Sequence, residues 1–72
     1  MKTIKRMYYL EFAHEAEEGN YTMQSVWCNT STEALKLLDL FDYISDDIHI
    51  WLMRADFYDD DSYDIEEAKH IR

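Results

Sequence analysis

The chain of 72 residues carries sixteen acidic and seven basic side chains, which gives a formal net charge of −9. That charge argues against direct binding of nucleic acid, which requires a basic surface, and against binding of anionic membranes. At 47% hydrophobic and 15% aromatic the composition is typical of a folded chain, and we expect one small domain over residues 1–72.

The single cysteine and the N-terminal sequence indicate a cellular location. Cys28 has no second cysteine with which to form an intrachain disulfide, which fits a reducing compartment. The N-terminus has basic residues but no apolar run of signal-peptide length, and no stretch approaches the length of a membrane span. We therefore expect a cytoplasmic protein.

The first half of the chain predicts a β-hairpin followed by a helix. Residues 3–14 alternate in polarity and form the first strand, and a polar connection over residues 15–20 reverses the chain at Gly19. Residues 21–28, rich in β-formers, form the second strand. Thr30 and Glu33 then have the spacing of a capping box, and an apolar stripe from Ala34 to Ile44 predicts a helix of about four turns.

The second half predicts a third strand over residues 48–58, while residues 63–71 suit either a short helix or a fourth strand. The expected fold is α+β, a three-stranded antiparallel sheet with one helix packed on a face (ββαβ) and this C-terminal element. The predicted core consists of Ile4, Tyr8, Leu10, Phe12, Val26, Ala34, Leu37, Leu38, Phe41, Ile44, Ile48, Ile50 and Leu52.

The sheet face opposite the helix is predicted to be apolar as well, whereas a free-standing antiparallel sheet normally has a polar outer face. Aromatic and methionine side chains of this kind are typical of interface cores. Three covers are open: the C-terminal segment, a second copy in a homodimer, or a foreign partner. The predicted interface residues are Met7, Tyr9, Met23, Trp27, Trp51, Met53 and Phe57, together with Ala13, His49 and Ala55.

The acidic residues are concentrated in residues 39–67, which hold eleven acids and one base, Arg54. Asp39, Asp42 and Asp46 are spaced i, i+3 and i+7, so the predicted helix would carry them as a ladder along one flank. Acids near a helix C-terminus oppose the helix dipole, which favours a functional reason for them over a structural one. The predicted partner-binding acids are Asp39, Asp42, Asp46, Asp47, Asp56, Asp59, Asp60, Asp61 and Asp64.

No pattern in the sequence predicts catalysis, a cofactor or a metal site. The aspartates after residue 58 do not fit the EF-hand loop, because Asp64 or Ile65 stands where that loop requires glycine. His14, His49 and His70 are far apart in the sequence and share no motif with Cys28. We expect a protein that is not an enzyme and that binds no cofactor and no metal.

A chain of this size with clustered carboxylates, a ββα-type core and no catalytic motif resembles the small acidic inhibitors of phages and other mobile elements. These include anti-CRISPR, anti-restriction and DNA-glycosylase inhibitor proteins, many of which are DNA mimics. The resemblance covers the whole chain by size, charge and layout, and the segment from Ser25 to Leu38 is common in small phage proteins. No motif in it assigns site residues.

The resemblance implies a non-enzymatic inhibitor that binds the basic nucleic-acid-binding surface of a target through a DNA-mimicking acidic patch. Such a target would be a CRISPR effector or a restriction or repair nuclease. The alternative is a homo-oligomeric structural or adaptor protein that acts through its aromatic and methionine sheet face.

Overall fold

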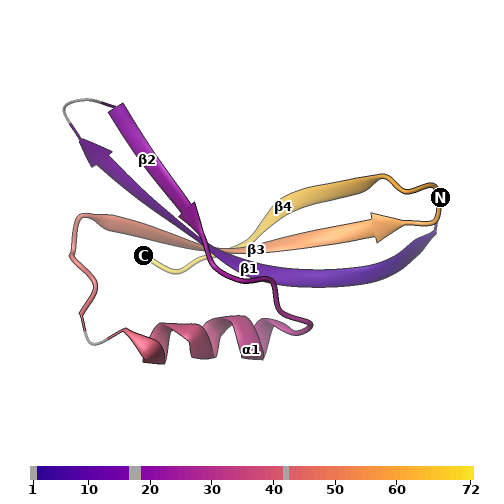
Figure 1. Cartoon of the computed structure of the whole chain (residues 1–72), viewed down its shortest axis with the longest axis horizontal. Coiled ribbons are helices and arrows are strands. Elements are labelled where there is room, and N and C mark those ends of the chain that lie inside the picture. Colours follow the sequence, from indigo (N-terminus) through magenta and orange to yellow (C-terminus); the bar gives the residue numbers. More distant parts are fainter. Residues whose placement is uncertain (1, 17–18, 42) are drawn as a thin grey trace.

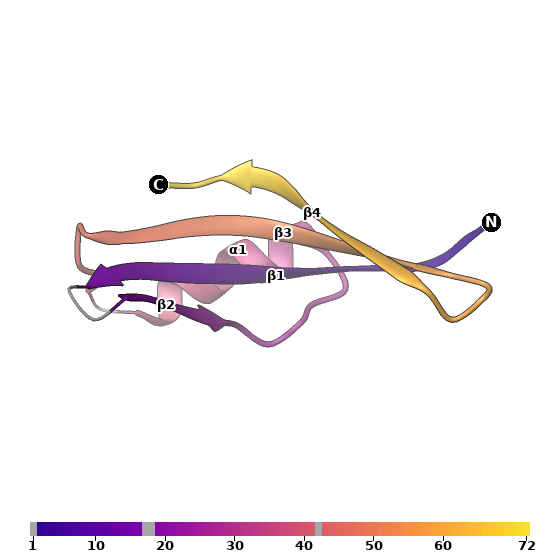
Figure 2. The same ribbon diagram turned by 90° about the horizontal axis from the view of Figure 1, so that it is seen from above.

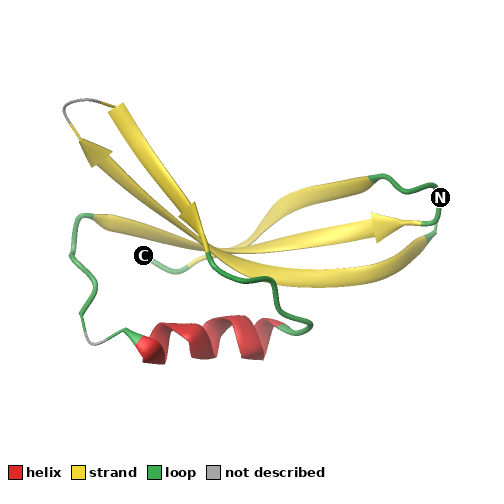
Figure 3. Ribbon diagram, viewed as in Figure 1, coloured by secondary structure: helices red, strands yellow, loops and turns green. Residues whose placement is uncertain are grey.

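The computed structural model describes residues 2–16, 19–41 and 43–72. The elements are β1 (Thr3–Ala16), β2 (Gly19–Gln24), α1 (Ser31–Lys36), the 3-10 helix η1 (Leu37–Leu40), β3 (Ile48–Tyr58) and β4 (Tyr63–His70). The strands form one antiparallel sheet in the order β2-β1-β3-β4, and α1 lies on one side of it (Figures 1 and 2). The predicted α+β class is confirmed, and the undecided C-terminal segment is a fourth strand (Figure 3).

The hydrophobic core lies between α1 and the middle of the two central strands. Leu10 pairs with Leu52 and Phe12 with Ile50 across β1 and β3, and Ala34 of α1 packs against them. All five side chains are buried, and Leu10 and Ala34 have no exposed surface. Partly buried around them lie Tyr8, Cys28, Leu35, Leu37, Leu38, Ile44, Ile48 and Ile71.

Three predicted core residues are instead exposed by 45% or more: Ile4, Val26 and Phe41. Ile4 lies where the pairing of β1 with β3 shifts register between Thr3 and Lys5, at the end of the sheet that α1 does not cover (Figure 1). Phe41 follows η1 in an extended conformation, and its ring centroid lies 5.7 Å from that of Phe12 at the edge of the core. Val26 lies in an irregular stretch of the second strand described below.

The hairpin of β1 and β2 is tighter than predicted. Pairing continues to Ala16 opposite Gly19, and the predicted polar connection over residues 15–20 is therefore wrong. Gly19 begins β2 at a φ of +133°, a conformation that residues with a side chain rarely adopt. Polar residues pair in this part of the sheet because it lies beyond the helix, so the hydrophobic pattern gave no signal for it.

The helix begins where predicted and ends about a turn early. Thr30 is the N-cap, and its Oγ1 accepts a hydrogen bond of 3.1 Å from the amide of Glu33, as the capping box predicts. The helical part ends at Leu40, because Phe41 has extended dihedral angles (φ −100°, ψ 123°). Aspartate is a poor helix former and an acid here opposes the helix dipole, so the residues that suggested a ladder also favour this early end.

The chain forms a β-bulge against β1 directly after β2 ends at Gln24. Gln24 lies opposite Glu11 but Cys28 lies opposite Tyr8, so this strand has one residue more than β1 over the same distance. At the bulge Ser25 donates its amide to the carbonyl of Leu10 at 2.9 Å, and its Oγ accepts from the amide of Leu10 at 2.8 Å. The side chain of Ser25 thus replaces a missing ladder bond.

We expect Ser25→Ala to lower the free energy of unfolding by about 1–2 kcal/mol, because it leaves the amide of the fully buried Leu10 without its acceptor. Urea unfolding of the variant and the parent measures the difference. Ser25→Thr keeps the hydroxyl and serves as the control. Equal stability of the alanine variant and the parent would contradict this role of the hydroxyl.

Candidate interaction surfaces

The sheet face opposite α1, here called the aromatic face, is built by alternate residues of three strands. Tyr9 lies opposite Met53, Met7 opposite Ala55, and the register continues this face into β4. Directly opposed residues of an antiparallel pair point to the same side of the sheet. The aromatic face therefore holds the predicted residues Met7, Tyr9, Ala13, His49, Trp51, Met53, Ala55 and Phe57, and also Tyr63 and Ile65, with the acids Glu11 and Glu67 on the same side.

The strand register moves Met23 to the other side of the sheet and explains why Trp27 lies on the aromatic face. Met23 lies opposite Phe12 and so points to the helix side of the sheet, where it is 61% exposed. Trp27 lies on the aromatic face only because the bulge shifts the alternation between Gln24 and Cys28. The Trp27 ring stacks on Tyr9, with centroids 4.9 Å apart and planes 8° from parallel.

The aromatic rings partly cover one another. A row runs from Tyr9 through Trp27 to Phe57 and Tyr63, with centroid distances of 4.9, 5.9 and 5.6 Å. Tyr9 is only 2% exposed because it begins this row under the Trp27 ring, and this burial raises the pKa of the Tyr9 hydroxyl. The uncovered apolar surface of the aromatic face is therefore smaller than the number of its aromatic residues suggests.

The C-terminal segment does not cover the aromatic face. β4 pairs edge to edge with β3, from Phe57 opposite Tyr63 to Trp51 opposite His70, and so widens the face. The Trp51 and His70 rings stack on this face with centroids 5.2 Å apart. The prediction that the C-terminal segment covers the aromatic face is therefore wrong. A second copy and a foreign partner remain as possible covers.

The predicted ladder of aspartates does not exist. Asp39 is exposed on η1, Asp42 lies outside the described residues, and Asp46 is a fully exposed residue of the loop before β3. Because the helical part ends at Leu40, Asp46 shares no helix flank with Asp39. Arg72 at the C-terminus lies 3.6 Å from the Asp46 carboxylate.

Asp47 anchors the loop before β3 to the end of β1. Its carboxylate accepts hydrogen bonds from the Ser45 hydroxyl and from His14, whose Nε2 lies 2.8 Å from Asp47 Oδ2. These two bonds lower the pKa of Asp47. Arg72 holds the same loop by donating to the carbonyls of Ser45 at 2.6 Å and Ile44 at 3.3 Å.

Asp56 is part of a charged network and is not available to a partner. Only 6% of it is exposed, and its Oδ1 accepts a hydrogen bond of 2.6 Å from Nε of Arg6. Arg54 Nε lies 3.4 Å from Asp56 Oδ2, and the Arg54 guanidinium also pairs with Glu66. The network joins β1, β3 and β4 on the helix side of the sheet, so the assignment of Asp56 to the partner surface is wrong.

The remaining predicted acids gather in the hairpin between β3 and β4. We call residues 59–67 the acidic hairpin, because they include Asp59, Asp60, Asp61, Asp64, Glu66 and Glu67 and no basic residue. All nine residues are exposed. The sequence reasoning placed the aspartates in one cluster but did not find that a strand carries half of these acids.

Hydrogen bonds hold the carboxylates of the acidic hairpin in place. Asp60 Oδ1 accepts from the amide of Ser62 at 3.1 Å and from its hydroxyl at 2.5 Å, which lowers the pKa of Asp60. Asp64 accepts from the Tyr58 hydroxyl at 2.8 Å, which raises the pKa of Tyr58. Asp61 has a φ of +69°, in the left-handed region that aspartate tolerates better than most residues.

The two groups of exposed acids lie at opposite ends of β3. Asp46 and Asp47 precede Ile48, where β3 begins, and the acidic hairpin follows Tyr58, where β3 ends. Ten steps of about 3.3 Å separate these ends by about 33 Å. The acids that form one run in the sequence are therefore two surfaces in space.

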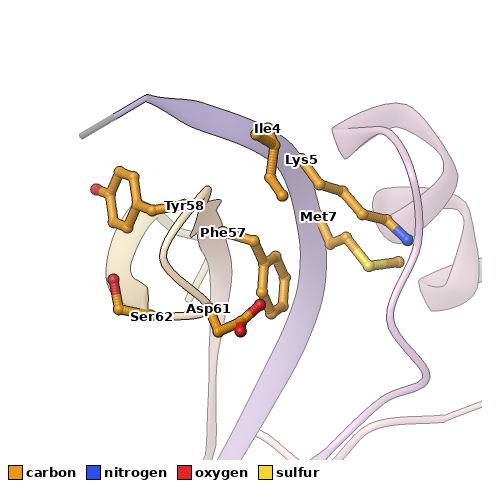
Figure 4. Close-up of a pocket in the computed structure, with 7 residues that line it drawn as sticks. All are labelled: Ile4, Lys5, Met7, Phe57, Tyr58, Asp61 and Ser62. Carbon is orange, nitrogen blue, oxygen red and sulfur yellow. The ribbon is translucent and has the colours of Figure 1, made fainter.

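A pocket of about 330 Å³ opens beside the acidic hairpin. Figure 4 shows Ile4, Lys5 and Met7 of β1 on one side of it and Phe57 and Asp61 on the other. Tyr58 and Ser62 complete the lining. Its apolar floor and opposite charges suit an apolar or amphipathic side chain of a partner protein.

Within residues 2–16, 19–41 and 43–72, no three His, Cys, Asp or Glu residues lie close enough to hold a metal ion. In that same part of the chain, no helix has both the length and the apolar character needed to cross a membrane.

Comparison with protein-family models, with curated proteins and with solved structures finds no match to this chain. The resemblance to small acidic inhibitors therefore stays a prediction.

We expect Asp56→Asn to lower the free energy of unfolding by about 2 kcal/mol or more, because it removes the counter-charge of Arg6 and leaves Arg54 paired with Glu66 alone. The loss should stay below that of a fully buried pair, since the Arg6 side chain is half exposed. Urea unfolding measures it. Asp59→Asn, at an exposed position, should change stability by less than about 0.5 kcal/mol. Equal effects of the two variants would contradict the network.

The lowered pKa of Asp47 predicts how its contribution to stability depends on pH. A lowered folded-state pKa means a contribution that is full above the unfolded pKa of about 3.9 and is lost as the pH falls through the folded value. The stability difference between the parent and Asp47→Asn should therefore shrink from pH 6 to pH 3. An NMR titration of the Asp47 carboxyl and urea unfolding at both pH values measure this. A constant difference would contradict it.

Proposed function

We propose that this protein is a non-enzymatic inhibitor that covers a basic, nucleic-acid-binding surface of a partner protein and so excludes the nucleic acid. A CRISPR effector or a restriction or repair nuclease has a surface of this kind. The observation that carries the proposal is the acidic hairpin, where six acids and no base stand exposed at one end of the sheet.

The geometry of the acidic hairpin favours binding over mere solubility. Its carboxylates are ordered by Tyr58, Ser62 and Arg54, so less side-chain entropy is lost when a partner binds them. A concentrated charge also steers the encounter with a basic surface and selects against acidic partners. The beginning of β4 and the pocket beside Phe57 add apolar contacts next to the charge.

The proposed mimicry does not require the helical ladder of aspartates. Without a helical ladder, the mimicry of a polyanion lies in charge and exposure at the end of a sheet. Asp46 and Asp47 precede the other end of β3, about 33 Å from the turn of the acidic hairpin, and need not take part.

The second candidate is a homo-oligomeric structural or adaptor protein that acts through the aromatic face. The specific observation in its favour is that β4 widens this face without covering it. If this candidate is right, we expect the melting temperature to rise with protein concentration and partner binding to be insensitive to salt.

The test is competition with DNA for purified CRISPR effectors, restriction nucleases and repair glycosylases, measured by mobility shift. We expect the protein to displace DNA from at least one of them. A variant with Asp59→Asn, Asp61→Asn and Glu67→Gln should compete about tenfold or more weakly, because it removes three charges from the acidic hairpin. Competition should also weaken as the screening length falls from about 10 Å at 0.1 M salt to about 3 Å at 1 M.

The matched control carries Glu33→Gln, Asp39→Asn and Asp46→Asn, which remove the same charge from the helix and the loop after it. It should compete as the parent does. If both triple variants compete equally, or if salt has no effect, the acidic hairpin is not the inhibitory surface.

A further inference from the structure

β4 is an open edge of the sheet. It pairs with β3 on one side only, at the end of the strand order, and all eight of its residues are exposed. A strand edge with unpaired amides and carbonyls is a template on which another strand can form.

The hydrogen-bond pattern shows which backbone groups face outward. The Tyr58 amide donates to the Ser62 carbonyl at 2.9 Å, so these two residues form a hydrogen-bonded pair. Antiparallel ladders alternate, which places Asp64 and Glu66 in the next such pairs with β3. The amides and carbonyls of Tyr63, Ile65 and Glu67 therefore point away from the sheet.

The second half of this edge carries a bulge and a lysine, two features that commonly block strand pairing. The register shifts between Leu52 and Met53, which leaves Ala68 as an extra residue in β4, and Lys69 follows it. Bulges and lysines of this kind protect edge strands. The first half, from Tyr63 to Glu67, pairs regularly with β3 and has neither.

The two sides of this open half differ in chemistry. Tyr63 and Ile65 lie on the aromatic face, 56% and 41% exposed, and Glu67 follows them on that side, whereas Asp64 and Glu66 lie on the other side of the sheet. A strand added here would need apolar side chains next to Tyr63 and Ile65 and basic side chains next to Asp64 and Glu66.

We propose that Tyr63–Glu67 binds an extended segment of the partner as a fifth, antiparallel strand in which basic and apolar residues alternate. This strand addition rests on the proposed function and specifies how the acidic hairpin holds a basic protein. A second copy of this chain fits the edge poorly, because it would bring two acidic hairpins of six acids each together.

The probe is an eight-residue peptide of alternating lysine and valine with blocked ends. Strand addition places its valines opposite Tyr63 and Ile65, so the valine amides make the bonds to β4. We expect the peptide to bind at about 50 mM salt and to slow hydrogen exchange at Tyr63, Ile65 and Glu67. The amides of Asp64 and Glu66 are already paired with β3 and are the internal reference.

Two N-methylated versions of the peptide test the backbone contacts with the unaltered protein. Methylation of the valine nitrogens should weaken binding about tenfold or more, whereas methylation of the lysine nitrogens should leave it nearly unchanged. The two have the same composition and charge. Equal affinities, or the reverse order, would overturn the inference, and so would equal binding of a glutamate–valine peptide.

The outcomes separate this inference from the proposed function. Binding of all lysine peptides without protection of the Tyr63, Ile65 and Glu67 amides overturns strand addition and leaves the charged surface in place. No binding of any lysine peptide contradicts both. Protection of those amides that rises with protein concentration in the absence of peptide shows that a second copy occupies the edge, which overturns the basic partner.

Discussion

The structure depends on the mismatch between a short helix and a long sheet. The helical residues Ser31–Leu40 span about 17 Å, whereas the molecule is 41 Å long. One helix of this length covers only the middle of one face, where Leu10 and Ile50 are buried. The rest of the sheet is covered by other interactions, and these interactions differ between the two faces.

Charge and aromatic rings supply the missing cover. On the helix side, Asp56 lies between Arg6 and Arg54 and pairs with both. On the other side, Trp27 lies flat on Tyr9. The bulge places Trp27 on this face, and the Ser25 hydroxyl accepts the Leu10 amide at the bulge, so one small polar side chain helps to order the aromatic face.

Local patterns predicted the parts of the fold that local chemistry determines. The alternation in residues 3–14 and 48–58 and the capping box at Thr30 each correspond to an element of the structure. The helix end and the Trp27 bulge depend on tertiary packing, which a periodic pattern does not contain. The sequence did not reveal the Asp56 network, because Arg6 and Asp56 are 50 residues apart in the chain. They meet only through the register of β1 with β3. Tyr63 and Ile65 alternate as a strand requires, but Ile65, Ala68 and Ile71 also suit a helix, and pairing with β3 decides between them.

The same carboxylates can keep the open edge from aggregating and select what binds to it. An exposed strand of eight residues would pair with copies of itself if its sides were neutral. The acids of β4 and of the turn before it oppose that pairing through like-charge repulsion, which acts over about 10 Å at 0.1 M salt. A basic strand experiences attraction at the same positions. Charge that serves only solubility would be as effective if it were spread over the surface, whereas here it is concentrated beside the half of β4 that has neither a bulge nor a lysine. This placement favours recognition of a basic extended segment over solubility as the reason for the acidic hairpin.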